Sequence, residues 1–279
     1  MSIAERSGLI EVFSNAAEDY DLRVPFFQPL AADLLDRAGV GPGQRVLDIG
    51  CGRGAVTFQA AQRVGESGEV VGIDIAEGMV NAIAADVERR GVANVSVHLM
   101  DGQRPDFAPA SFDHVLGSMS IIMVPSISSA LSHYRTLLRD GGTVGFTAPA
   151  MGNDPLEWRM GPFYLRRFLA EALPELTLED IANYIDVFHQ IEPHRMLTDL
   201  REAGYRDARA VDVITRVQAP TAQEILGWTF THGARVFWNM VPEPRRSEYA
   251  HQWIERIESE FAGSEPYYDT VSRIFFGTK

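Results

Sequence analysis

The sequence lacks several features that mark specialised classes of protein. Cys51 is the single cysteine among 279 residues, so no disulfide can form within the chain and a disulfide-stabilised secreted domain is excluded. No apolar run reaches the ~18 residues of a membrane-spanning helix, and the first residues do not combine a basic head with an apolar stretch. We therefore expect a cytoplasmic protein without a membrane partner.

Positive charge is scarce as well. Twenty-five Lys and Arg residues face 38 Asp and Glu residues, which gives a net charge of −13. Nucleic-acid backbones recruit basic surfaces, so we expect no nucleic-acid partner. The seven histidines show no HxxxH spacing and one cysteine cannot build a Cys/His cluster, so we predict no metal site. The partner that remains is a small molecule, and the sequence does not fix an oligomeric state.

The middle of the chain alternates apolar, β-branched segments with amphipathic helical patterns. Strands between helices of this size form right-handed βαβ units and a parallel sheet covered on both faces. We predict an α/β fold with a doubly wound, mostly parallel seven-stranded sheet and helical cap insertions. The expected strands are 45–49, 70–75, 95–99, 112–118, 142–148, 208–216 and 271–277. The expected helices include 54–64, 76–90, 127–139, which stops at the turn signal Asp140-Gly141-Gly142, and 194–204.

Composition changes along the chain predict its organisation. After residue 150 the rhythm of strands and helices gives way to two segments rich in aromatic residues. We expect these segments to cover the carboxyl edge of the sheet. The predicted parts are an N-terminal helical lid (1–34), an α/β core (35–150), a helical cap insertion (151–193), a core helix and strand (194–218), a second cap insertion (219–268) and a final core strand (269–279).

The segment RVLDIGCGRGAV, residues 45–56, carries the chemistry of the core. A glycine-rich turn between a strand and a helix lets a ligand approach the backbone and exposes amide groups at a helix N-terminus. Gly50, Gly52 and Ala55 satisfy the dinucleotide pattern G-x-G-x-x-G/A, and Asp74 follows about 20 residues later, as that pattern requires. Taken alone, this turn allows an NAD-dependent oxidoreductase.

Three carboxylates favour a cationic nucleoside over a dinucleotide. Asp48 lies next to the turn, where it would repel a pyrophosphate and attract an ammonium group. S-adenosylmethionine (SAM) has an ammonium group, a sulfonium cation and no phosphate. Asp74 can accept hydrogen bonds from the two ribose hydroxyls, and Asp101 can accept one from the adenine amino group. These residues follow three successive expected strands, whose carboxyl ends meet at one edge of the sheet.

The chain resembles the class I SAM-dependent methyltransferases, in particular their quinone-biosynthesis-like and actinobacterial natural-product branch. The resemblance lies in VLDIGCGRG, VVGIDIAEGMV, LMDGQRPDFAPASFDHVLGS and LLRDGGTVGFTAP. It implies SAM as cofactor and S-adenosylhomocysteine (SAH) as product, with a Rossmann-like methyltransferase fold. It implies a cofactor site of Tyr20, Asp48, Gly50, Cys51, Gly52, Asp74, Ile75, Met79, Asp101, Gly102 and Ser118. The apolar segment GSMSIIMV stands where the family often has a polar signature, so the motifs assign no catalytic residue.

The acceptor is expected to lie among the aromatic residues of the cap. Histidine is the usual general base near neutral pH, and His189 and His232 are the two candidates because both lie among these aromatics. A small aromatic or heterocyclic metabolite, an indole for example, suits such a pocket, and carbon, nitrogen and oxygen acceptors all remain open. A non-methylating cyclase with the same fold is a further alternative. The pocket residues we predict are Tyr164, Tyr184, Trp228, Arg235 and Trp238.

Overall fold

A computed structural model of the chain describes residues 3–18, 20, 24, 26–150, 159–160, 163–175, 191–231 and 235–279. The strands are β1 (Arg45–Ile49), β2 (Glu69–Asp74), β3 (Val95–Leu99), β4 (Phe112–Ser118), β5 (Leu138–Pro149), β6 (Arg159–Met160), β7 (Phe163–Tyr164), β8 (Arg206–Gln218) and β9 (Tyr267–Thr278). The helices are α1 (Ile3–Ala16), α2 (Phe27–Ala38), α3 (Ala55–Val64), α4 (Glu77–Arg90), the 3-10 turn η1 (Ile121–Met123), α5 (Ile127–Leu137), α6 (Leu165–Ala172), α8 (Pro193–Glu202), α9 (Ala222–Thr229), α10 (Arg235–Met240) and α11 (Arg245–Glu260).

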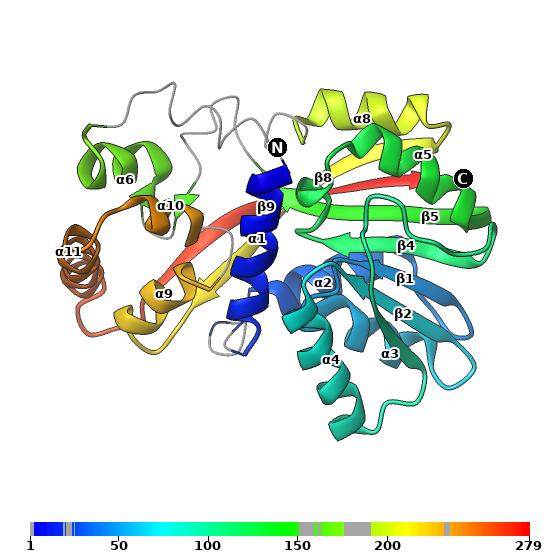
Figure 1. Ribbon diagram of the computed structural model, residues 1–279, viewed down its shortest axis with the longest axis horizontal. Coiled ribbons are helices and arrows are strands. Elements are labelled where there is room, and N and C mark those ends of the chain that lie inside the picture. The colour runs from blue at the N-terminus through cyan, green and yellow to red at the C-terminus, as the bar shows by residue number, and fades with distance from the viewer. Residues whose placement is uncertain are drawn as a thin grey trace.

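Seven strands form one sheet in the order β3-β2-β1-β4-β5-β9-β8 (Figure 1). The first five are parallel, and β9 pairs antiparallel with both β5 and β8. The predicted mostly parallel, seven-stranded sheet is therefore confirmed. From β1 the chain adds β2 and β3 on one side and then returns to add β4 and β5 on the other side, so the order of the strands switches between β1 and β4. Ligands of open α/β sheets bind at the carboxyl ends of the strands beside such a switch point.

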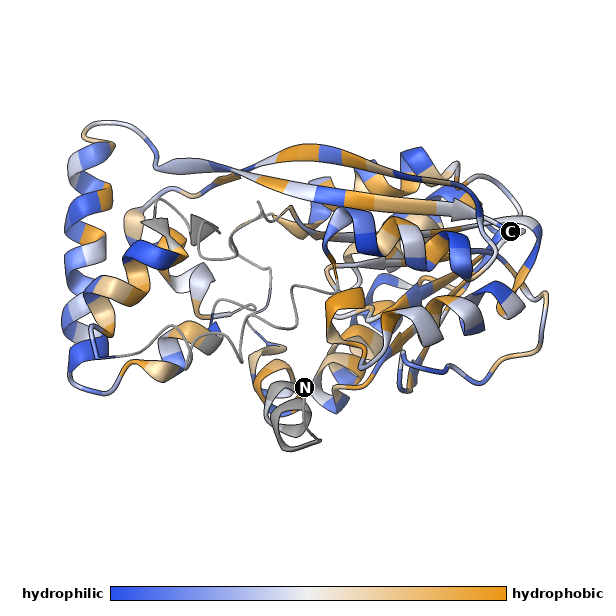
Figure 2. Cartoon of the chain, turned by 90° about the horizontal axis from the view of Figure 1, so that it is seen from above, coloured by the Kyte–Doolittle hydropathy of each residue, from blue (hydrophilic) through white to orange (hydrophobic). Residues whose placement is uncertain are grey.

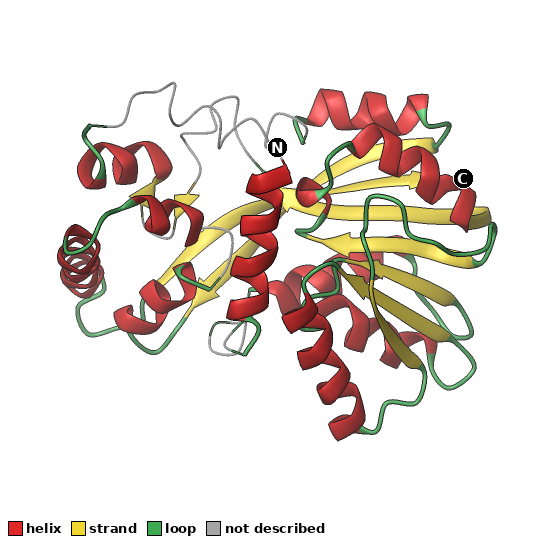
Figure 3. Cartoon of the chain, in the orientation of Figure 1, coloured by secondary structure: helices red, strands yellow, loops and turns green. Residues whose placement is uncertain are grey.

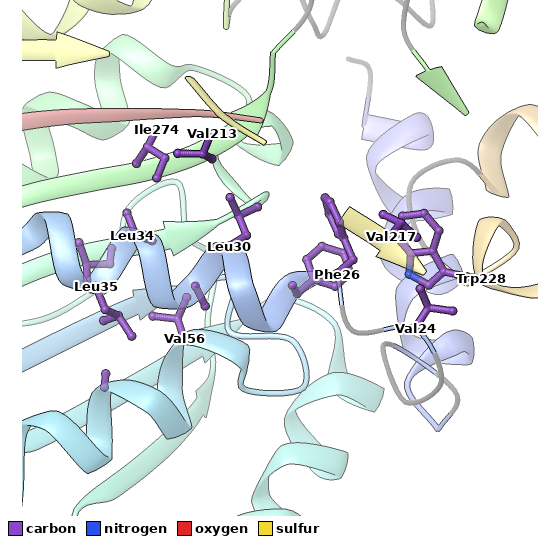
Figure 4. Packing of buried hydrophobic residues seen from close by; sticks show 14 of the residues in the cluster. Val24, Phe26, Leu30, Leu34, Leu35, Val56, Val213, Val217, Trp228 and Ile274 are labelled. Atoms are coloured by element: carbon purple, nitrogen blue, oxygen red, sulfur yellow. The ribbon is translucent and has the colours of Figure 1, made fainter. Parts of the chain in front are cut away.

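Helices cover both faces of the sheet (Figure 3). On one face of the sheet, apolar residues of α2 and α3 pack against the strands. Figure 4 shows Leu30, Leu34 and Leu35 of α2 in the same apolar cluster as Val213 of β8 and Ile274 of β9. On the other face, α5 and α8 bury a second apolar cluster that contains Tyr134 and Leu200. These two layers hold the carboxyl ends of the strands in fixed positions.

Strands β8 and β9 extend beyond the ranges predicted for them. The sequence predicted strands at 208–216 and 271–277, whereas the paired ladder continues to Gln218 opposite Tyr267. The extension stays in the strand conformation because Val213, Thr215 and Val217 alternate as buried residues along β8. The long pair leads from the core to the helices α9 and α11 (Figure 1).

Helices α6, α9, α10 and α11 come from the two segments expected to form a cap, and they pack around one aromatic cluster; we call these four helices the cap. Trp238 and Trp253 are fully buried, with ring centroids 5.4 Å apart, and Phe168 of α6 contacts both rings. The outermost helix, α11, buries Tyr249, Trp253 and Ile257, and in Figure 2 its ribbon alternates between hydrophilic and hydrophobic colours. The part of the cap that the structure describes therefore has its own apolar interior.

The predicted boundary between the helix 127–139 and the strand 142–148 is also wrong. The helix expected at 127–139 ends at Leu137, and β5 begins at Leu138, so the Asp140-Gly141-Gly142 signal lies inside a strand. Leu138 is fully buried opposite Phe112, and the pairing shifts register between Phe112 and His114. Burial of Leu138 outweighs the local preference for a turn. Gly141 adopts a φ of +80°, which glycine tolerates and which accommodates the shift in pairing register.

Within the ranges given above, no helix combines the length and apolar character needed to cross a membrane.

Candidate active site

Two adjoining cavities lie at the carboxyl ends of β1 and β4. Tyr20, Gly50, Gly52 and Ser118 border both of them. The smaller cavity is also lined by Phe27, Asp48, Cys51, Arg53, Ala55 and Val56. The larger cavity is also lined by Ile10, Phe13, Ile49, Asp74, Ile75, Ala76, Met79, Asp101, Gly102, Met119, Ser120, Met123 and Val124. Every cofactor-site residue predicted from the sequence thus borders at least one cavity.

The glycine turn between β1 and α3 requires glycine for two different reasons. Gly50, Gly52 and Gly54 have φ values of +68°, +49° and +83°, a region that side chains disfavour. At Gly50 a Cβ atom would also stand 2.5 Å from the Cβ of Ser120, whereas at Gly52 it would meet no atom within 4 Å. Gly50 therefore permits close packing of the turn against the end of β4, and Gly52 leaves room toward the cavities.

Asp48 places a buried carboxyl beside the smaller cavity. The residue is 1% exposed, and its Oδ2 accepts a hydrogen bond of 2.6 Å from the hydroxyl of Thr57. Its Oδ1 has no hydrogen-bond partner within the described part of the chain. Burial raises the pKa of this carboxyl to about 7, and the charge of Asp74 adds to the rise while Thr57 opposes it. An unpartnered buried oxygen of this kind fits a hydrogen-bond donor that carries positive charge.

Asp74 at the end of β2 fixes the turn and faces the larger cavity. Its two oxygens accept hydrogen bonds of 2.9 Å from the backbone N–H groups of Gly52 and Ala76. Burial raises the pKa of the Asp74 carboxyl, and the backbone hydrogen bonds oppose that rise. Each carboxylate oxygen has a second lone pair, so the same group can also accept from a ligand hydroxyl.

Asp101 and Gly102 form the next part of the wall. The Asp101 carboxylate accepts a hydrogen bond of 2.9 Å from the backbone N–H of Gln103, which closes a short turn after β3. The hydroxyl of Tyr134, on α5, donates to the carbonyl oxygen of Gly102. No sequence pattern points to Tyr134, because this contact joins residues 32 positions apart.

A kink after β4 joins the cavities to the rest of the sheet. Met119 has a φ of +56°, which is uncommon for a residue with a side chain. Its backbone N–H is held by the carbonyl and hydroxyl oxygens of Thr147, at 3.1 and 2.9 Å, and Ser118 contacts the same hydroxyl. The kink turns Ser120 back toward the glycine turn. The apolar segment GSMSIIMV thus lines the larger cavity, a role that the sequence analysis did not assign to Met119 or Ser120.

The remaining predicted cofactor residues contribute apolar surface. Met79 and Cys51 are buried, and burial raises the pKa of the Cys51 thiol, so this thiol is kept protonated and unreactive. Tyr20 stacks on Phe27 with ring centroids 5.2 Å apart and contacts Phe13 of α1. The N-terminal segment therefore contributes aromatic walls to both cavities.

The residues predicted for the acceptor pocket are placed differently. Trp238 is fully buried inside the cap, where its indole N–H donates to the Thr229 hydroxyl at 2.8 Å, so it packs the cap and does not border either cavity described above. Trp228 is 8% exposed and packs against Phe26 and Tyr268. Arg235 is half-buried at the start of α10. His189, His232, Tyr184 and the side chain of Tyr164 lie outside the part of the chain that the structure describes.

The described residues contain no group of three or more His, Cys, Asp or Glu side chains that could hold a metal ion. The larger and smaller cavities instead offer carboxylates, glycine backbone and apolar walls. Such a set of groups suits a nucleoside with a cationic tail.

Comparison with known proteins identifies the family. Residues 46–142 match the methyltransferase domain family. The chain is 40% identical over 256 residues to a nocamycin O-methyltransferase from Saccharothrix syringae, covering 90% of this chain and 91% of that protein. It is also 40% identical over 173 residues to the aklanonic acid methyltransferase DauC from Streptomyces sp. (strain C5), covering 61% of this chain and 76% of that protein.

A solved structure shares the fold. The Haemonchus contortus phosphoethanolamine N-methyltransferase 2, in complex with phosphomonomethylethanolamine and SAH, superposes with a TM-score of 0.57 at 18% identity, covering 90% of this chain and 52% of that one. The nicotinamide oxidoreductase and the non-methylating cyclase that the sequence left open are not favoured, since the relatives are named as methyltransferases. The glycine turn, the carboxylates at the carboxyl ends of β1, β2 and β3, and the extent of these matches lead to one conclusion: the chain belongs to the SAM-dependent methyltransferases.

Proposed function

We propose that this methyltransferase acts on an oxygen atom of a small, acidic natural product. One observation carries the proposal: the 40% identity covers 91% of a protein named as an O-methyltransferase. This likeness extends well past residue 142, where the match to the domain family ends, and so includes cap segments that could contact an acceptor. The name of the second relative, an aklanonic acid methyltransferase, supports an acidic acceptor.

The residues present fit SAM. The unpartnered Oδ1 of Asp48 suits the ammonium group, and Asp74 suits the ribose hydroxyls. Asp101 suits the adenine amino group, and Ile75 and Met79 supply apolar contacts at the same cavity. When bound, SAM supplies a methyl group that its sulfonium has already activated. The protein then has to bind, align and desolvate the two reactants, and alignment of this kind lowers a barrier by about 7–11 kcal/mol.

An acidic acceptor reduces the need for a general base. A carboxylic acid has a pKa near 4 and is ionised at neutral pH, so its oxygen attacks without first losing a proton. No histidine borders either cavity among the residues described. His189 and His232 stay predicted as bases for a hydroxyl acceptor, for which removal of the proton contributes about 10²–10⁴ in rate.

A row of aromatic rings beside the cavities supports an aromatic or heterocyclic acceptor. Ring contacts run from Tyr20, which borders both cavities, through Phe27 and Phe26 to Trp228, with successive centroids 4.8 to 5.2 Å apart. This row of rings connects the cofactor cavities to helix α9 of the cap (Figure 4 labels Phe26 and Trp228). Aromatic faces of this kind bind flat apolar molecules and stabilise cationic methyl donors.

The test is transfer of a labelled methyl group. The protein is incubated with trideuteromethyl-labelled SAM and with aklanonic acid, a benzoic acid, a phenol or an indole as separate acceptors, and products are identified by mass spectrometry. We expect label on the acids, and we expect mild alkali to release it where a methyl ester has formed. Transfer to the indole alone, or to no oxygen acceptor in the set, contradicts the proposal. Asp74→Ala serves as the control that lacks the ribose carboxylate.

A further inference from the structure

Helix α1 forms part of the wall of the cofactor site. Ile10 and Phe13 of this helix border the larger cavity together with Asp74. The helix lies against α4 (Figure 1), where the backbone of Ser14 sits so close to Gly78 that a Cβ atom there would collide with it. The Ser14 hydroxyl also accepts from the Gly78 N–H at 3.4 Å. The seating of α1 on α4 thus determines whether this wall is in place.

Arg53 connects α1 to the glycine turn. The residue stands between Gly52 and Gly54, in the turn that borders both cavities. Its guanidinium donates to the carbonyl oxygen of Ala17, directly after α1, and to that of Glu18 at 3.4 Å. The side chain is only 14% exposed, so this contact lies inside the protein and is not a surface ion pair.

Asp86 of α4 fixes the guanidinium from the opposite side. Its Oδ2 lies 2.8 Å from Nη2 of Arg53, and its Oδ1 lies 2.7 Å from Arg89. Burial acts to raise the pKa of the Asp86 carboxyl, but the hydrogen bond and charge of Arg53 leave that pKa below its usual value. The two arginines differ in one useful respect: Arg89 is 67% exposed and pairs with Asp86, whereas Arg53 also donates to the carbonyl oxygen of Ala17, directly after α1.

We propose that Arg53 is a positioning residue that couples the seating of α1 to the conformation of the glycine turn. A ligand that settles in the turn restrains the backbone of residues 50–54. That restraint fixes the Arg53 guanidinium, which in turn holds Ala17 and closes the wall formed by Ile10 and Phe13. Because coupling between two sites is reciprocal, seating of α1 must strengthen ligand binding by the same factor that the ligand strengthens seating.

The experiment uses SAH and the whole chain, so it is independent of the acceptor. Hydrogen exchange of the backbone amides in residues 8–17 reports the seating of α1, and surface plasmon resonance gives the dissociation rate of SAH. In the wild type we expect SAH to slow exchange in this segment. In Arg53→Gln we expect fast exchange that SAH no longer slows, and dissociation of SAH about tenfold faster, within the usual range of coupling between sites.

Two further variants separate this coupling from simple loss of stability. Arg89→Gln removes the other partner of Asp86 without touching α1, and we expect wild-type exchange and dissociation. Arg53→Gln combined with Asp86→Asn leaves no unpaired buried charge, so it keeps the measurement usable if the single variant does not fold. We expect the double variant to release SAH as fast as Arg53→Gln does.

A double-mutant cycle distinguishes action through α1 from direct contact with the ligand. Gly78→Ala pushes α1 away by steric conflict while leaving Arg53 in place, so it should also accelerate SAH dissociation. If Arg53 acts through α1, combining Gly78→Ala with Arg53→Gln adds little to either change alone. Multiplicative effects on the dissociation rate, or unchanged exchange of residues 8–17 in Arg53→Gln, overturn the proposal.

Discussion

The hydroxyl of Thr57 donates a hydrogen bond of 2.6 Å to one oxygen of Asp48, while the other oxygen of Asp48 has no partner within the described residues. The pair joins Asp48, near the end of strand β1, to Thr57 in the first turn of α3, across the glycine turn. Thr57 therefore orients the carboxyl and leaves its free oxygen for a ligand. Asymmetry of this kind is costly in a purely structural role, because a buried unsatisfied oxygen destabilises a fold by about 1–3 kcal/mol.

Replacing Thr57 with Val should weaken SAH binding at neutral pH. Thr57 is the hydrogen-bond donor that opposes the rise in the pKa of Asp48, so its loss raises that pKa further and leaves the carboxyl protonated. We expect about tenfold weaker affinity at pH 7 and partial recovery at pH 9, measured by calorimetry. Thr57→Ser retains the hydroxyl and should bind nearly as the wild type does; equal loss in both variants argues against an electrostatic role.

The stability of the ligand-free protein should fall as the pH rises from about 4 to above 7. The pKa of Asp48 is about 7 in the folded protein and about 4 in the unfolded chain, so between these values the folded state holds a proton that the unfolded state has lost. The loss of stability is complete once the pH passes the folded pKa, and it amounts to roughly 2–4 kcal/mol. Urea unfolding at pH 5 and pH 8 measures it.

Asp48→Asn is the matched variant for this pH dependence. It keeps a similar shape but cannot ionise, so the difference in unfolding free energy between pH 5 and pH 8 should shrink. Asp74, whose pKa is also raised by burial, contributes a remainder of the same sign. An undiminished difference in Asp48→Asn means that other groups cause it.

Asp74→Ala should abolish SAH binding that calorimetry can detect. The substitution removes the acceptor proposed for the ribose hydroxyls, together with the two hydrogen bonds that hold Gly52 and Ala76. Circular dichroism should still report the folded sheet, since Asp74 lies at the end of β2 and outside the apolar layers. Unchanged SAH affinity removes Asp74 from the cofactor site.

Two glycines of the turn should respond differently to alanine. Gly50→Ala strains the backbone and collides with Ser120, so we expect a loss of unfolding free energy of about 2 kcal/mol or more. Gly52→Ala meets no protein atom and adds only the backbone strain, about 1 kcal/mol, yet its methyl group extends toward the cavities. Thermal unfolding and SAH titration together should show Gly50→Ala as the less stable variant, and Gly52→Ala as folded with weakened binding. Wild-type affinity in Gly52→Ala would show that the ligand does not approach this part of the turn.

The sheet, the glycine turn and the carboxylates at the ends of three strands are predictable from the sequence alone. These features depend on local chemistry: alternation of apolar strands with amphipathic helices, glycine where φ is positive, and acidic residues at strand ends. For that reason β1, β3 and β4 begin and end at the residues predicted, and Asp48, Asp74 and Asp101 border the two cavities that the structure contains at the carboxyl ends of the strands.

The distant side chains that complete the site became visible only in the folded chain. The hydrogen bond between Thr57 and Asp48 joins residues close in the sequence. The hydrogen bonds from Met119 to Thr147 and from Tyr134 to Gly102 instead join separate elements. The hydrogen bond from Arg53 to Ala17 joins the glycine turn to the end of the N-terminal helix. Such partners are selected by packing geometry across the sheet, which local propensity does not encode. The same holds for Trp238: its aromatic side chain suits a pocket as well as a core, and only the folded chain shows it fully buried, with its indole N–H on the Thr229 hydroxyl.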